Sequence, residues 1–433
     1  MNKNHKYRPL PILLVNAVGA LAMSTFGAKK KLKVDRLLSQ ARRRTGLEDF
    51  GPDDFLEPFN LLVQCYNTEA KLNFIGRLSA KIYLLQLLEN RLRLEHDRKE
   101  YPEIAKQKIQ SPVFILGLPR TGSTLLFELM ALNPALRAPM SWEVMLPSPP
   151  PQRSTFTCDP RIKKADRLFA WVDRIAPDFR HIHAIGSCRP QECLAISAQS
   201  FRSIQFHTTH QVPTYQAWLN DADLLPAYQY HRRMLQHFQA FGPQGTWLLK
   251  APAHIFGIKE LFDVYPDARI VQTHRDPIPV AGSIASHCVS LRQAFSETLD
   301  LDNIGTSWCR LWSMGLQRTL NFRRDHPEFE TRFVDLPYEQ LTHDPLDAVE
   351  KIHERFELSF EQEACKRVEE YLSANPKGRH GVHHYRLEDY GLSSGQVAKH
   401  FGSYRNQLHG EYTGPLSSFV SDCSVKPAVN SRH

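Results

Sequence analysis

The sequence predicts an α/β fold built on a mostly parallel β-sheet between layers of helices, and three observations support this prediction. Short apolar runs occur at residues 113–116, 247–249, 268–273 and 333–336, as buried strands require. Segments with helical spacing of apolar residues separate these runs. A glycine-bearing turn over residues 117–122 joins the first run to a helix. Strands that alternate with helices favour parallel pairing with right-handed crossovers.

The pattern divides the chain into three parts. Residues 1–110 are predicted to form an N-terminal helical region. Residues 111–410 are expected to form the α/β domain, with a helical insertion around 150–240 that caps the functional site. Residues 411–433 are polar and rich in serine and proline, which predicts a flexible tail. The helical spacing of the first part is carried by Leu37, Leu38, Ala41, Ile75, Leu78, Ile82, Leu85, Leu88 and Leu92.

Composition limits the classes of protein to which this chain can belong. Its 433 residues are 42% hydrophobic and 23% charged, which is typical of a globular protein and excludes disordered and multi-span membrane proteins. The formal net charge of +8 indicates an anionic ligand or surface. No zinc-finger spacing or RNA-binding aromatic motif accompanies that charge, so no nucleic-acid partner is expected. The eight cysteines form no CxxC pairs, which is typical of free thiols in a reducing compartment and predicts a cytoplasmic protein.

An uncharged stretch over residues 9–28 follows three basic residues near the start of the chain. Two prolines, two glycines and Asn16 lower its apolarity and make it a poor transmembrane span. We expect a packed or peripheral helix from about Leu13 onward. An anchor or signal segment is the alternative, so membrane contact through this stretch stays open.

Residues 117–124, Gly-Leu-Pro-Arg-Thr-Gly-Ser-Thr, form a phosphate-sized loop between a strand and a helix. Glycines let backbone amides converge on an anion, and the following helix points its positive end at that anion. The spacing is that of the nucleotide-binding P-loop, so we expect a P-loop NTPase-like three-layer fold. Ser123 stands where that motif needs a lysine, which disfavours the alternative of a nucleotide kinase or NTPase. Arg120 places a cation inside the loop, where it suits a shorter anionic group such as a 5'-phosphosulfate.

A second cluster follows the third predicted strand. Arg275 lies in the sequence Thr-His-Arg-Asp-Pro at the end of that strand, and Ser283 follows eight residues later. Ligands of doubly wound sheets bind beyond the carboxyl ends of the strands, so Arg275 is expected at the same edge as the first loop. An arginine with a nearby hydroxyl group suits a second phosphate.

A third motif, Lys-Gly-Arg-His-Gly at residues 377–381, completes a pattern that resembles the PAPS-dependent sulfotransferase superfamily. PAPS is 3'-phosphoadenosine 5'-phosphosulfate. Residues 119–124 look like the 5'-phosphosulfate loop of that family, and Arg275 with Ser283 matches its 3'-phosphate pair. The third motif is similar to the loop that closes over the 3'-phosphate in many members. Over about residues 8–405 the chain resembles the bacterial-type branch with an N-terminal helical extension.

The resemblance implies transfer of a sulfuryl group from PAPS to a hydroxyl of a small-molecule, lipid or carbohydrate acceptor, with release of adenosine 3',5'-bisphosphate. Arg120 and Lys250 are then expected to hold oxygens around the sulfur, by analogy with phosphoryl transfer. The family mechanism requires no metal, and none is expected here. The residues expected to bind the donor are Arg120, Thr121, Gly122, Ser123, Thr124, Arg275, Ser283, Lys377 and Gly378.

The catalytic base has two candidates. Relatives directed at tyrosine or carbohydrate place a glutamate after the loop helix, where Glu143 lies 23 residues after Arg120. The cytosolic small-molecule branch uses a histidine two residues after its lysine, but that position is Pro252 here, and His254 lies two residues further on. We favour Glu143 and keep His254 as the alternative. The sequence leaves the acceptor and the oligomeric state open.

Overall fold

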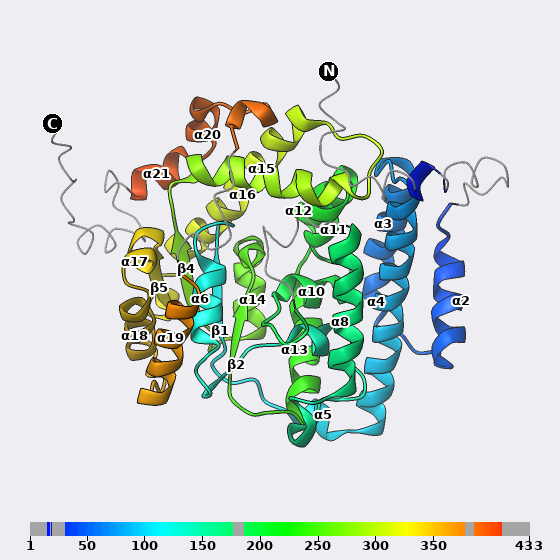
Figure 1. Cartoon of the computed structure of the whole chain (residues 1–433), viewed down its shortest axis with the longest axis horizontal. Coiled ribbons are helices and arrows are strands. Elements are labelled where there is room, and N and C mark those ends of the chain that lie inside the picture. The colour runs from blue at the N-terminus through cyan, green and yellow to red at the C-terminus, as the bar shows by residue number, and fades with distance from the viewer. Residues whose placement is uncertain (1–14, 18, 20–30, 176–185, 377–384, 409–433) are drawn as a thin grey trace.

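A five-stranded parallel sheet forms the centre of the computed structural model, which describes residues 15–17, 19, 31–175, 186–376 and 385–408 (Figure 1). The strands lie in the order β2-β3-β1-β4-β5, and every neighbouring pair is parallel. Because β1 is central, the turn that follows it lies in the middle of the carboxyl edge of the sheet. The strands are β1 Val113–Gly117, β2 Leu136–Arg137, β3 Thr246–Lys250, β4 Arg269–His274 and β5 Phe333–Pro337.

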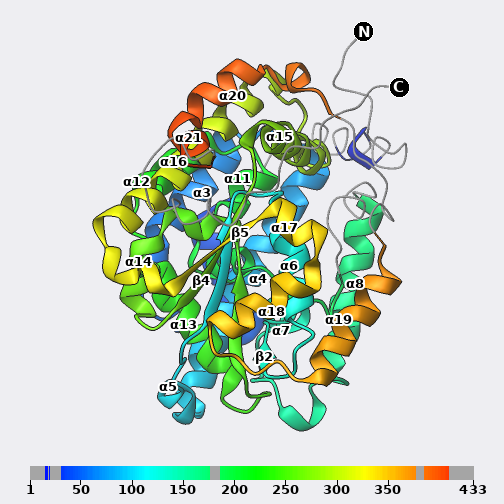
Figure 2. The same ribbon diagram turned by 90° about the vertical axis from the view of Figure 1, so that its left-hand side faces the viewer.

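Successive residues of each strand face opposite sides of the sheet, so the fold has three layers. In β1, Phe114 and Leu116 face the larger hydrophobic core, whereas Val113 and Ile115 face the smaller one. The larger core also contains residues of the N-terminal helices. Figures 1 and 2 show the two helical layers on either side of the sheet.

The smaller core is covered by α6 Ser123–Met130, α17 Tyr338–His343, α18 Pro345–Arg355 and α19 Gln362–Ala374. The larger core is covered by α13 Leu225–Gln239, α14 Ile258–Val264, α15 Pro277–Gln293 and α16 Leu301–Asp325. The N-terminal helices are α2 Val34–Thr45, α3 Leu56–Thr68, α4 Phe74–Glu100 and α5 Glu103–Lys106. Between β2 and β3 the chain forms α7 Ser141–Met145, α8 Pro160–Ile175, α10 Cys193–Ser197, α11 Gln205–Thr209 and α12 Pro213–Asp221 before α13. Two short helices, α20 Ser394–His400 and α21 Gly402–Leu408, end the described chain.

The predicted fold class is confirmed, and the four predicted strands correspond to β1, β3, β4 and β5 within one residue at each end. The structure adds β2, whose two residues are too few to show a strand pattern in the sequence. None of the helices described here is long and apolar enough to cross a bilayer. The predicted tail at 411–433 and most of the stretch 9–28 lie outside the described residues.

Candidate active site

A cavity of about 490 Å³ lies at the carboxyl edge of the sheet, beside the turn that follows β1. The ends of β3 and β4 and helices from both layers contribute to its wall. This is the edge at which parallel α/β sheets bind their ligands. Its polar wall includes Arg120, Gly122, Ser123, Thr124, Glu192, Lys250 and Arg275.

The shape of the turn after β1 depends on two glycines. The φ angles of Gly117 and Gly122 are 136° and 82°, in the region that favours glycine. A Cβ on Gly117 would lie 2.4 Å from the carbonyl oxygen of Thr273, and one on Gly122 would lie 2.7 Å from the Leu341 side chain. Arg120 also has a positive φ, 67°, a strained conformation of the kind that clusters at functional sites. The backbone therefore passes close to the cavity at the start of α6, where amide groups favour an anion.

Three of the residues predicted to bind the donor meet beside this turn. Arg120 Nε donates a hydrogen bond to Ser283 Oγ at 3.1 Å. Arg275 Nη1 donates to the carbonyl oxygen of Arg120 at 2.8 Å, and the Arg275 guanidinium lies 3.9 Å from the centre of the Tyr338 ring. Arg120 therefore contacts both Ser283, through its side chain, and Arg275, through its carbonyl oxygen.

A buried network behind Arg275 holds the end of β4 in place. His274 Nε2 lies 2.8 Å from Asp335 Oδ1, and His274 Nδ1 lies 3.1 Å from the Tyr404 hydroxyl. Arg323 donates to both oxygens of Asp335 at 2.7 and 2.8 Å. Burial alone would raise the pKa of Asp335, but the hydrogen bonds from Arg323 and His274 hold that pKa well below its ordinary value. Residues of α16, β5 and α21 together hold His274, the last residue of β4, directly before this arginine.

Lys250 ends β3 and faces the same cavity, with 2% of its surface exposed. Its Nζ donates to Thr124 Oγ1 at 3.1 Å and forms an ion pair with Glu192. Glu192 immediately precedes α10 and also lines the cavity. Sequence reasoning missed Glu192 because no motif marks it and it lies 58 residues before its lysine partner. The only signal was an acidic residue just before a short apolar helix.

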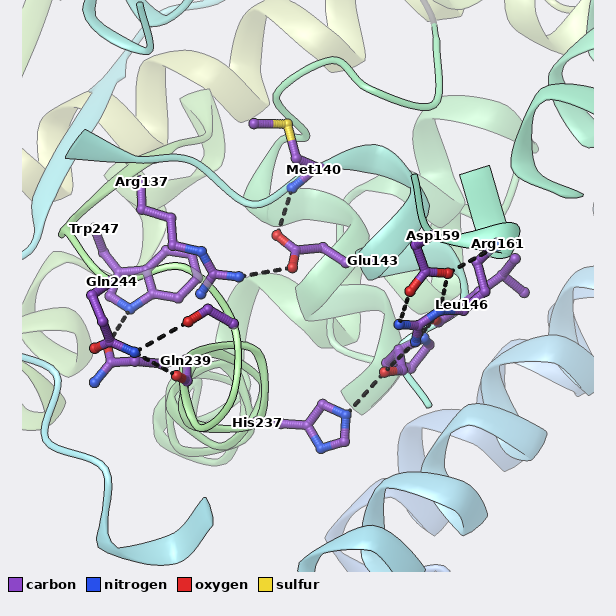
Figure 3. A network of polar contacts seen from close by, with 12 residues as sticks. Arg137, Met140, Glu143, Leu146, Asp159, Arg161, His237, Gln239, Gln244 and Trp247 are labelled. Carbon is purple, nitrogen blue, oxygen red and sulfur yellow. Dashed lines mark hydrogen bonds and ion pairs between the residues drawn. The ribbon is translucent and has the colours of Figure 1, made fainter. Parts of the chain in front are cut away.

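Glu143, the favoured base in the sequence analysis, does not line this cavity. Figure 3 shows its contacts with Arg137 and Met140. Glu143 is fully buried in α7, where Oε2 accepts from Arg137 Nη2 at 2.9 Å and Oε1 accepts from the Met140 backbone N–H at 2.8 Å. The Arg137 guanidinium lies over the Trp247 ring at 4.3 Å. Burial raises the pKa of Glu143, and the charge of Arg137 opposes that rise. The position of Glu143 therefore gives no geometric support to its role as the base.

His254, the alternative base, is also outside the cavity that contains Lys250. Its Nδ1 lies 2.9 Å from the Tyr228 hydroxyl, and its ring meets Phe114 edge-on at 5.0 Å. It borders a separate cavity of only about 50 Å³. Burial and, to a lesser degree, His231 lower the pKa of His254 well below its ordinary value. These contacts describe a histidine that is packed in the core.

The remaining predicted donor-binding residues divide into two groups. The Thr121 hydroxyl donates to the Leu118 carbonyl oxygen at 2.6 Å and lies 2.6 Å from the Thr273 hydroxyl, so this side chain joins the turn to β4. Lys377 and Gly378 lie outside the described residues.

Within the part of the chain that the structure describes, no three histidine, cysteine, aspartate or glutamate side chains form a group that could hold a metal.

Comparison with known proteins places this chain in a family. Residues 112–362 match the model of the sulfotransferase family. Over 309 residues the chain is 26% identical to omega-hydroxy-beta-dihydromenaquinone-9 sulfotransferase Stf3 of Mycobacterium bovis, a match that covers 67% of this chain and 73% of the relative.

Two solved structures are similar over most of the chain. Sulfotransferase STF1 from Mycobacterium tuberculosis H37Rv has a TM-score of 0.77 and 31% sequence identity, and the match covers 87% of this chain and 100% of that one. Sulfotransferase STF9 from Mycobacterium avium has a TM-score of 0.77 and 27% identity, over 87% of this chain and 97% of that one.

Proposed function

Because the chain belongs to the sulfotransferase family and is a sulfotransferase, we propose that PAPS is its donor and a hydroxyl compound its acceptor. The observation that carries this proposal is the meeting of Arg120, Arg275 and Ser283 beside the turn after β1. The turn suits one anionic group and the cluster suits a second, and PAPS carries a phosphosulfate and a separate phosphate. Ser123 in place of the P-loop lysine gives no support to the kinase alternative.

Each part of the donor has a proposed set of contacts. The amides of residues 121–124 and the hydroxyls of Ser123 and Thr124 would hold the 5'-phosphosulfate, since they lie at the start of α6. Arg275 and Ser283 would hold the 3'-phosphate. The resemblance adds the segment that begins at Lys377 to this second set.

We assign the role of base to Glu192 in place of Glu143, because Glu192 lines the cavity beside Lys250. In an in-line transfer the acceptor oxygen bonds to sulfur while the bond between sulfur and the 5'-phosphate oxygen breaks. Glu192 takes the proton of the acceptor hydroxyl. Lys250, next to Thr124, offsets the negative charge that develops on the departing phosphate.

The ion pair between Lys250 and Glu192 gives the site a resting state. In this ion pair each group is neutralised by the other. An anionic group beside Lys250 competes for that lysine and thereby frees the Glu192 carboxylate to accept a proton. Donor binding and activation of the base are coupled in this scheme, so an acceptor that arrives first meets a base that is still paired.

Thermal unfolding in the presence of nucleotides tests the choice of donor. Adenosine 3',5'-bisphosphate is expected to raise the Tm without Mg²⁺, since a ligand at about 100 times its Kd stabilises the folded state by about 2.7 kcal/mol. ATP lacks the 3'-phosphate and should produce little shift at the same concentration. A larger shift with ATP and Mg²⁺ than with adenosine 3',5'-bisphosphate would contradict PAPS as the donor.

We further propose a cytoplasmic location with peripheral contact at a membrane surface. The cysteines in the described ranges form no disulfide, which is typical of a reducing compartment. Val15, Leu78 and Ile82 expose 50%, 49% and 54% of their surface. Asn16 Oδ1 accepts from the Ile75 N–H at 3.1 Å, which places Val15 beside the start of α4, the helix that carries Leu78 and Ile82. Together these three side chains offer an apolar surface for lipid contact.

Replacing Leu78 and Ile82 together with serine is expected to weaken binding to phosphatidylglycerol vesicles several-fold in a sedimentation assay, because exposed apolar area is lost. Tyr101→Ser is a suitable control, since Tyr101 is 42% exposed and follows the far end of the same helix. Equal vesicle binding by the double variant and the unchanged protein would argue against this surface.

A further inference from the structure

One side of the cavity wall, the half that packs against the larger hydrophobic core, is apolar. α15 contributes Ile284 and Cys288, which are four residues apart and therefore lie on one face of the helix. α16 contributes Trp308 and Trp312 with the same spacing. We call this half the acceptor chamber; its apolar wall consists of Leu194, Ile204, Ile284, Cys288, Trp308 and Trp312.

The two tryptophans form a fixed aromatic wall. Their ring centres are 6.3 Å apart with an interplanar angle of 22°, and 2% and 4% of their surfaces are exposed. Trp308 stacks on His207 at 5.4 Å, and Trp312 packs against Phe256 at 5.3 Å. Because His207 and Phe256 hold the two rings in place, the chamber presents a preformed apolar face to a ligand.

Few polar side chains line the cavity together with the chamber. Glu192 and Lys250 form an ion pair there, and Lys250 also contacts Thr124 of the turn after β1. Among the described lining residues, the other polar groups of this half are the side chains of Thr208 and His287 and the indole N–H groups of Trp308 and Trp312, which have no hydrogen-bond partner. A sugar carries several hydroxyl groups, and each needs a partner when it leaves water. An alcohol with an apolar body needs a polar partner only at its single hydroxyl group, and burial of the rest is favourable.

We infer that the acceptor is an apolar alcohol, with an aromatic or isoprenoid body seated against Trp308 and Trp312 and its hydroxyl group directed to Glu192. This inference rests on the proposed function, since it places the acceptor in the same cavity as the donor. It selects one class from the small-molecule, lipid and carbohydrate acceptors that the sequence leaves open. Trp308 and Trp312 are then specificity-determining residues, and they leave the contacts of the donor untouched.

Binding of model alcohols to the full-length protein without PAPS tests the inference. 2-Naphthol and farnesol serve as the apolar probes and glucose as the sugar, with Kd measured by isothermal titration calorimetry. Either apolar alcohol is expected to bind, and Cys288→Phe, which fills the chamber, should raise its Kd about tenfold or more, equivalent to about 1.4 kcal/mol. Trp308→Phe and Trp312→Phe should raise the Kd less, because an aromatic face is kept.

Two controls separate failure of the inference from failure of the proposed function. The Tm shift with adenosine 3',5'-bisphosphate should be the same in every chamber variant, which also shows that each variant is folded. Trp218→Ala changes a tryptophan of α12 that hydrogen-bonds to Glu57 and does not line this cavity, so it should leave the alcohol Kd unchanged. The inference would be overturned if the unchanged protein bound glucose but neither apolar alcohol, and if Cys288→Phe abolished the glucose binding. Loss of the nucleotide shift in the unchanged protein would instead count against the donor.

Discussion

Replacing Arg275 with alanine is expected to raise the KM for PAPS by about 10- to 100-fold. Hydrogen bonds to charged groups contribute about 1.5–3 kcal/mol each, and one such contribution converts to a ratio of this size. Arg275 also donates to the carbonyl oxygen of Arg120, so its loss loosens the turn after β1. The turnover of saturated enzyme should fall much less, because Lys250 and Glu192 keep their places. Steady-state kinetics at varied PAPS concentration separate the two effects.

Arg324→Ala is a matched control for this variant. Arg324 lies on α16 with 64% of its side chain exposed and pairs with Asp325, so its removal takes away the same charge without touching the cavity. Arg275→Lys should recover only part of the affinity, since lysine keeps the charge but cannot form two parallel hydrogen bonds. An unchanged KM for PAPS in Arg275→Ala would show that Arg275 does not bind the 3'-phosphate.

Glu192→Gln is expected to lower kcat by about 10²- to 10⁴-fold, the range that a general base contributes. Glutamine keeps the size of the side chain but cannot take the proton of the acceptor hydroxyl. Binding of adenosine 3',5'-bisphosphate should persist, because Lys250 no longer has to leave an ion pair to meet an anion. Single-turnover kinetics with a saturating acceptor measure the chemical step directly.

Glu143→Gln provides the matched comparison. This change breaks the buried ion pair with Arg137, and removing one partner of such a pair costs about 3–5 kcal/mol of stability. The Tm should therefore fall, while kcat per folded molecule stays close to that of the unchanged protein. Suppose that Glu192→Gln kept full turnover while folded Glu143→Gln or folded His254→Ala lost it. The base would then be Glu143 or His254, as the sequence suggested.

Local patterns in the sequence were sufficient to predict the central sheet and the position of Arg275 beside the turn after β1. Buried strands are short apolar runs, and the turn after β1 is recognised from its glycines, which φ angles of 136° and 82° require. The spacing between Arg275 and Ser283 is informative because β4 leads directly into α15, so both residues have fixed places along one continuous segment. Asp276 caps this helix by accepting a hydrogen bond from the Ile278 N–H. Such features depend on neighbours along the chain, and sequence reasoning is strong there.

The other side of the site depends on contacts between distant segments. Glu192 meets Lys250 only after the chain between α10 and β3 has folded back on itself. Spacing from Arg120 suggested Glu143, but the direction of a side chain is set by packing, and Arg137 draws this carboxylate into the core. Trp308 and Trp312 look like ordinary core residues at helical spacing, and only the cavity distinguishes them.

The network behind Arg275 also has a consequence for biosynthesis. The turn after β1 precedes α21 by most of the described chain, yet the Tyr404 hydroxyl that meets His274 belongs to α21. Domains that emerge in order from the ribosome fold as their parts become available. The network that supports the end of β4 therefore reaches its final form only after α21 has been translated. A nascent chain that stops before α21 would carry the turn after β1 without this support for the neighbouring strand.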